Sequence, residues 1–84
     1  MSNKIHGLVA VITYRYETRG NRQIVSGSNV YIALKSDKGN IGVASAVLGG
    51  NYNAEQALKE FQKQPQRFAK IDAGYDMAKA MNLC

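Results

Sequence analysis

Two long runs of alternating residues, separated by a turn signal, dominate the first half of the chain. From Ile5 to Thr18 β-branched and aromatic residues fall on both faces of an extended segment, which is typical of a strand. Arg19–Arg22 contains Gly and Asn, which tolerate positive φ, and a second run follows from Gln23 to Ser36. The pattern predicts a β-hairpin.

The apolar residues also select a register for this hairpin. A three-residue loop over residues 20–22 matches apolar residues with one another on one face, and a two-residue loop would place Ile12 opposite Asn29 but would also match Val11 with Val30. A bulge at Gly27 would reconcile the two registers. We therefore expect the first register, with these pairs: Ile12 with Val30, Ala10 with Ile32 and Leu8 with Leu34.

A third strand is expected from Asn40 to Leu48, after the turn at Ser36–Gly39. Leu34 then faces Ile41, and Ile32 faces Val43. The three strands form an antiparallel meander with one apolar face. We expect the core side to carry Leu8, Ala10, Ile12, Tyr14, Val30, Ile32, Leu34, Ile41, Val43 and Val47.

Two helices are expected after the meander. Asn53 followed by Gln56 has the spacing of a capping box, which predicts a helix start. Pro65 suits the first turn of a second helix, in which Phe68, Ile71, Tyr75 and Ala78 recur at helical spacing and which Gly74 would end or bend. The fold class is therefore α+β, a three-stranded antiparallel meander followed by two helices packed on one face (βββαα). A fourth strand at residues 67–72 is the main alternative.

Length and cysteine usage limit the class of protein. A chain of 84 residues fits a single domain, residues 1–84. Its longest strongly apolar run, Leu8–Ile12, is far shorter than the roughly 20 residues that span a bilayer. The N-terminus lacks the pattern of a signal peptide, and Cys84 is the only cysteine, so an intrachain disulfide is excluded. We expect a cytoplasmic protein.

The residue types that carry catalysis or bind metals are scarce. His6 is the only histidine, and no residue can be identified that would orient it beside a nucleophile. Asp72 and Asp76 are four apart, but no further ligands complete a metal shell around them. The glycines at 49–50 lack the spacing of a phosphate-binding loop. The sequence therefore predicts a protein that is not an enzyme, with no catalytic residues, no metal and no cofactor.

Positive charge gathers in the first half of the chain. The formal net charge is +5, of which residues 1–40 carry +4, since six Lys and Arg there stand against Glu17 and Asp37. The first hairpin mixes arginines with tyrosines, the residue types most enriched at interface hot spots. Its candidate partner-binding residues are Tyr14, Arg15, Tyr16, Arg19 and Arg22.

The other face of the expected sheet is unusually apolar for a solvated surface. In the preferred register it presents Val9, Val11, Tyr31, Ala33, Gly42, Ala44, Ala46 and Leu48. We expect this face to pack against a partner or a second copy. The candidate partner or dimer residues are Val9, Val11, Tyr31, Ala33 and Leu48.

These features favour a small non-catalytic binding protein that acts through the basic hairpin, the apolar sheet face, or both. In size and broad architecture the chain resembles accessory proteins of phages and mobile elements, including anti-CRISPR proteins and other inhibitors of host defence, although no motif carries the resemblance. It implies a host-cytoplasmic protein that occludes a site on a larger protein complex. Two alternatives stand beside it: a nucleic-acid-binding protein that uses the same hairpin, and a structural homo-oligomer subunit.

Overall fold

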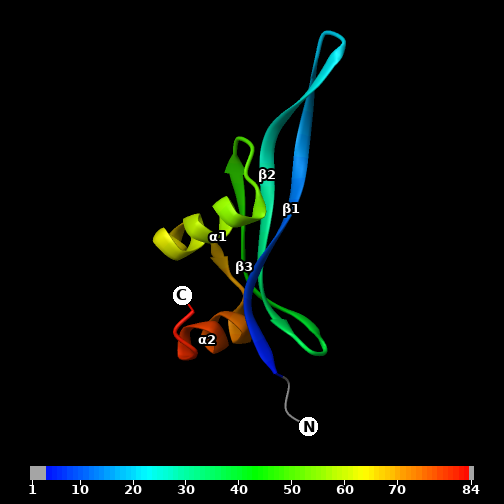
Figure 1. Cartoon of the computed structure of the whole chain (residues 1–84). Helices are drawn as coiled ribbons and strands as arrows, with labels where there is room; N and C mark the ends of the chain where they lie inside the picture. Colours follow the sequence, from blue (N-terminus) through cyan, green and yellow to red (C-terminus); the bar gives the residue numbers. More distant parts are fainter. Residues whose placement is uncertain (1–3, 84) are drawn as a thin grey trace.

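The computed structural model describes residues 4–83, with the side chain of Asp72 excepted, so Cys84 lies outside the described residues. A four-stranded antiparallel sheet in the order β1-β2-β3-β4 is combined with two α-helices (Figure 1). This is an α+β fold, as expected. Its elements are β1 (Ile5–Arg19), β2 (Arg22–Ser36), β3 (Gly39–Gly49), α1 (Ala54–Lys63), the 3-10 turn η1 (Pro65–Arg67), β4 (Ala69–Lys70) and α2 (Asp72–Ala80).

The first hairpin has the predicted register over its body, where Ile12 pairs with Val30 and Leu8 with Leu34. Its tip is nevertheless a two-residue loop, since Arg19 pairs with Arg22. A bulge in β2 connects the register of the tip to the register of the body. Arg15 pairs with Gly27 and Tyr16 with Val25, which leaves Ser26 as the extra residue. The bulge therefore lies one residue before the predicted position.

A second bulge in the sheet corrects the predicted pattern of β3. Leu34 pairs with Ile41 as expected, but Ile32 pairs with Ala44 instead of Val43. Because Val43 is the inserted residue, every later side chain of β3 changes face. The predicted core residue Val47 is 64% exposed, and Leu48, predicted on the opposite face, is buried in the core. Ala44 and Ala46 also belong to the core side.

The first helix begins as predicted. The backbone N–H of Gln56 donates to the Asn53 side chain at 2.8 Å, and the Asn53 N–H donates to the Gln56 side chain at 3.0 Å, which completes a capping box. Helix α1 then buries Ala57 and Phe61. The hydrogen bonds account for two of the four N–H groups that a helix start leaves without partners.

The second helix starts later than predicted, and a short strand precedes it. Pro65 opens a single 3-10 turn, and Phe68 is already extended. Ala69 and Lys70 pair with β3, and the Ile71 N–H donates to the Val43 carbonyl at 2.8 Å. The helical spacing of Phe68 and Ile71 is therefore misleading, because the free edge of β3 supplies backbone partners that a helix would leave unused. The βββαα arrangement is correct only in part.

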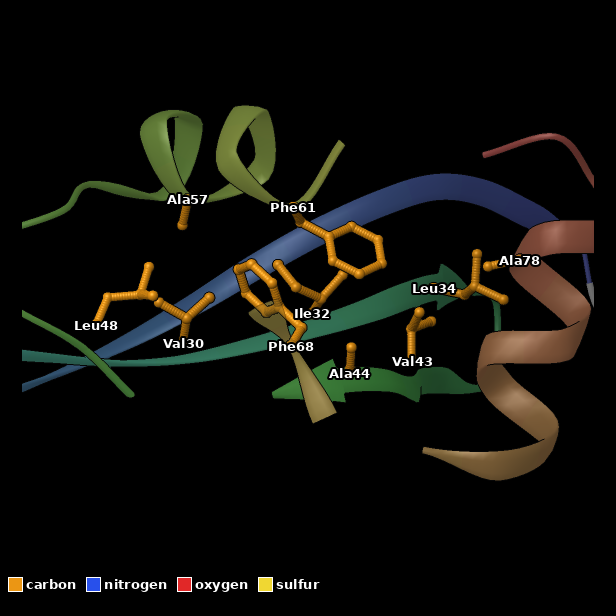
Figure 2. Packing of buried hydrophobic residues seen from close by; sticks show 10 residues of the cluster. All are labelled: Val30, Ile32, Leu34, Val43, Ala44, Leu48, Ala57, Phe61, Phe68 and Ala78. Carbon is orange, nitrogen blue, oxygen red and sulfur yellow. The ribbon is translucent and has the colours of Figure 1, made fainter. Parts of the chain in front are cut away.

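One hydrophobic cluster joins the helices to the sheet. Figure 2 shows Phe61 of α1 directed toward Ile32 and Phe68, and Ala78 of α2 beside Leu34. The rings of Phe61 and Phe68 meet edge to face, with centroids 5.1 Å apart. The buried cluster consists of Val30, Ile32, Leu34, Val43, Ala44, Leu48, Ala57, Phe61, Phe68 and Ala78.

Helix α2 approaches β3 at two glycines. A Cβ on Gly74 would overlap the carbonyl oxygen of Gly42 and lie 2.7 Å from its carbon. Gly74 was expected to end or bend the helix, but it lies inside α2, which continues to Ala80. The glycine therefore serves close packing of helix on strand rather than termination.

Candidate functional site

The first hairpin extends well past the rest of the sheet (Figure 1). The last pair between β2 and β3 joins Gly27 to Gly49, so residues 16–26 have no third strand beside them. We call residues 16–26 the hairpin arm. It gives the molecule its elongated shape, with principal extents of 54 × 25 × 19 Å.

The hairpin arm contributes nothing to the hydrophobic core. All of its residues are exposed except Val25, which is half-buried, and none belongs to the buried cluster. Tyr16 is 61% exposed, and Ile24 is also exposed. Large apolar side chains on both faces of a two-stranded ribbon are therefore open to a partner.

The arginines and tyrosines of the predicted hairpin site lie on different faces of the ribbon. Arg15 pairs with Gly27, and Arg19 pairs with Arg22, so these arginines share the face that lies opposite the core. Tyr16 pairs with Val25 on the other face. Twist rotates both faces along the ribbon but does not exchange them. The five predicted residues thus do not form one cluster.

Charge on the hairpin arm and on Arg15, which directly precedes it, is only partly neutralised. The Arg19 Nε lies 3.0 Å from Glu17 Oε1, and both side chains are exposed. Among the carboxylates whose side chains the structure describes, none lies within ion-pair distance of Arg15 or Arg22. The aliphatic part of Arg15 lies over Gly27, where its Cδ is 3.9 Å from the position of an added Cβ. Two guanidinium groups are available to an acidic ligand.

Tyr14 is tied to the fold. Its hydroxyl donates to the Tyr52 carbonyl at 2.8 Å, and the side chain is half-buried. Beside it, the Ser28 hydroxyl donates to the Gly50 carbonyl at 2.9 Å and accepts from the Tyr52 N–H at 3.1 Å. These bonds fix the segment that leads from β3 into α1. The contacts give Tyr14 a structural role, while Tyr16 stands free.

A groove runs along the sheet face opposite the core, which we call the open face. The groove has a volume of about 480 Å³ and is mainly apolar. Val11 is 47% exposed, Tyr31 40% and Val47 64%. The lining residues are Val11, Thr13, Asn29, Val30, Tyr31, Ser45, Ala46, Val47 and Ala69.

Only part of the predicted open face is available. Val9 is half-buried, Ala33 is fully buried, and Leu48 belongs to the core. The Tyr31 hydroxyl sits over Gly42, the residue that pairs with Ala33, and Ile71 approaches the same position. The part of the open face that holds the groove includes Val47. The sequence places Val47 in the core instead, because no local pattern reveals the bulge at Val43.

The described residues bring few chemically reactive groups together. His6 Nε2 lies 2.6 Å from Asp37 Oδ1, and both side chains are exposed. Among the side chains that the structure describes, no three His, Cys, Asp or Glu residues gather as metal ligands. None of the helices in this range combines the length and apolar character needed to cross a membrane. The geometry offers surfaces for contact.

Comparisons with protein-family models, with curated proteins and with solved structures found no match.

Proposed function

We propose that this chain is a non-catalytic binding protein that uses the hairpin arm to cover a functional site on a larger protein. The observation that carries the proposal is the arm itself, an ordered ribbon that buries nothing in the core. A two-stranded hairpin alone is marginally stable, and ordering each backbone residue costs about 1–2 kcal/mol. An arm with no share in the core is best explained by contact with a partner.

The chemistry of the arm favours an acidic protein surface as that partner. Among the carboxylates that the structure describes, none lies at ion-pair distance from Arg22 of the arm or from Arg15 just before it. Tyr16 and Ile24 are exposed on opposite faces of the ribbon. A surface that combines unpaired guanidinium groups with exposed aromatic and aliphatic side chains is typical of interface hot spots. Positive charge would also accelerate association with an acidic partner.

A small basic protein that blocks a macromolecular complex would act in the way expected of phage or mobile-element accessory proteins that inhibit host defence. It would work in the cytoplasm of the cell that contains its target, and a chain with a single cysteine agrees with a reducing compartment.

A second candidate is nucleic-acid binding, favoured by the three arginines on one face of the ribbon. A two-stranded ribbon can enter the major groove of duplex DNA. If three arginines contact phosphates, the logarithm of the binding constant should fall with the logarithm of salt concentration with a slope of about −3.

The test compares two triple variants with equal charge. Arg15→Ala/Arg19→Ala/Arg22→Ala removes three positive charges from the hairpin, and a control variant removes three from other exposed positions. Both lower the formal net charge from +5 to +2. The control residues are Lys38, Lys63 and Lys79.

A partner recovered from host lysate after nuclease treatment is titrated against the wild type and both variants. We expect the hairpin variant to bind at least about tenfold more weakly, a loss of about 1.4 kcal/mol, with the control near wild type. Equal affinity for all three proteins would overturn the role of the arm. Salt-dependent binding to labelled duplex or single strand, lost in the same variant, would instead support the second candidate.

A further inference from the structure

Strand β1 leaves one side of the sheet open. It is the first strand in the order β1-β2-β3-β4, and Figure 1 shows no further strand beyond it. Its outer backbone N–H and C=O groups therefore have no ladder partner within the described sheet. An edge strand of 15 residues is long for a globular protein.

The middle of this edge lacks the charges, prolines and bulges that usually hinder pairing. Residues 8–14 contain no charge, no proline and no glycine. The two irregularities of the β1–β2 ladder lie outside this stretch, one at His6 and the other at Ser26. Charged side chains begin only at Arg15 and continue with Glu17 and Arg19. Natural edge strands normally carry such charges or bulges along their length.

We propose that a second copy of this chain pairs with this edge, β1 against β1 in antiparallel orientation. Pairing the uncharged stretch 8–14 with itself places Val11 opposite Val11 of the second copy. Opposite residues of an antiparallel pair share a face, so a two-fold axis through Val11 keeps both cores on one side of the joined sheet. A slip by one residue would put core side chains on the open face.

This register is also compatible with the charges of the strand. Arg15 falls opposite Gly7 of the second copy, and Glu17 falls opposite Ile5, so no like charges meet. On the core side Leu8 meets Tyr14, and Ala10 meets Ile12. A shift by two residues would instead set Arg15 against Val9 or Ile5. The sequence of β1 is therefore self-complementary around Val11.

The dimer adds to the proposed function without depending on it. The open faces of the two copies would join, with Val9, Val11 and Thr13 of each copy side by side. Because the paired strands run in opposite directions, the two hairpin arms would point away from each other. The protein would then present two separate contact sites, which raises the apparent affinity for a repetitive target.

The first test measures the oligomeric state by sedimentation at increasing protein concentration, from about 1 to 300 µM. We expect the wild type to dimerise within this range and Val11→Lys to weaken the dimer at least about tenfold, because two lysines would then lie opposite each other. Val47→Lys is the matched control, since Val47 is also exposed on the open face but lies on β3. Circular dichroism checks that both variants fold.

The second test places cysteines in a Cys84→Ser background and oxidises them. Val11→Cys should cross-link two chains, since directly opposite Cβ atoms lie about 4.5–5.5 Å apart. Thr13→Cys alone should not cross-link, because Thr13 of one copy lies opposite Val9 of the other. A chain that carries both Val9→Cys and Thr13→Cys should therefore cross-link. A monomer at all concentrations, equal weakening by Val11→Lys and Val47→Lys, or cross-linking through Val47→Cys in place of Val11→Cys would each overturn edge pairing.

Discussion

Substitution of Gly74 by alanine separates the effect of helix propensity from the effect of tertiary packing. Gly74 lies in the first turn of α2, where alanine is the better helix former by up to about 1 kcal/mol. On that ground alone the variant should be more stable. The added methyl group, however, would overlap the Gly42 carbonyl oxygen and lie 2.7 Å from the carbonyl carbon.

The loss of stability in Gly74→Ala depends on which atoms must move to make room for the added methyl group. The obstructing atoms are backbone atoms of β3, which cannot rotate away as a flexible side chain would. Helix α2 must therefore shift outward and loosen its contact through the fully buried Ala78. Overpacking of this kind costs about 1–3 kcal/mol, and it outweighs the propensity gain. We expect a net loss of about 1–2 kcal/mol from a domain whose total stability is about 4–12 kcal/mol.

Urea unfolding followed by circular dichroism measures this difference. With a slope of about 1–3 kcal/mol per molar urea, the midpoint should fall by about 0.3–2 M. Ala73→Gly is the matched control, because Ala73 is exposed in the same turn and the change should cost about 0.5–1 kcal/mol by propensity alone. If helix propensity alone acted, Gly74→Ala would raise the free energy of unfolding and Ala73→Gly would lower it. If the contact with Gly42 dominates, both variants lose stability. A Gly74→Ala protein as stable as the wild type would refute the packing argument.

Three further predictions concern contacts in the body of the fold, each measured by urea unfolding. Phe61→Ala should cost about 3–5 kcal/mol, because it empties a fully buried aromatic site; a loss below about 1 kcal/mol would contradict this. Asn53→Ala should cost about 1 kcal/mol by removing the capping box, whereas Asn51→Ala in the exposed loop should stay within about 0.5 kcal/mol. Tyr14→Phe should cost about 1 kcal/mol by removing a hydrogen bond to the backbone, and Tyr16→Phe should be neutral; equal effects would argue against the structural role of Tyr14.

Local patterns in the sequence were sufficient for the body of the first hairpin and for the start of the first helix, but not for the two-residue tip of the hairpin or the bulge at Ser26. Alternation identifies β1 and β2, and the match of Ile12 with Val30 selects the register that the structure contains. The Asn53 to Gln56 spacing identifies the start of α1. These features are predictable because they depend on neighbours in the chain or on one facing strand.

Long-range contacts explain the errors further along the chain. The spacing of Phe68 predicts a helix, but the next residues, Ala69 and Lys70, pair with residues of β3 that lie more than twenty positions earlier in the chain. An apolar residue at this position is buried whether its own backbone is helical or extended. Phe68 is extended, and its ring packs on Phe61 of α1. Which hydrogen bonds the segment makes depends on the elements already in place around it.

The candidate site also has some features that are visible in the sequence and others that depend on the fold. Composition and alternation, which are local properties, already show that basic and aromatic residues gather in one hairpin and that the sheet carries apolar residues on both faces. The folded structure alone establishes that the inserted Val43 buries Leu48 and exposes Val47. It also decided that Tyr14 is held by Tyr52 while Tyr16 stands free, and that residues 16–26 extend past β3. Each of these depends on where another strand or loop ends, which no pattern within a single segment can specify.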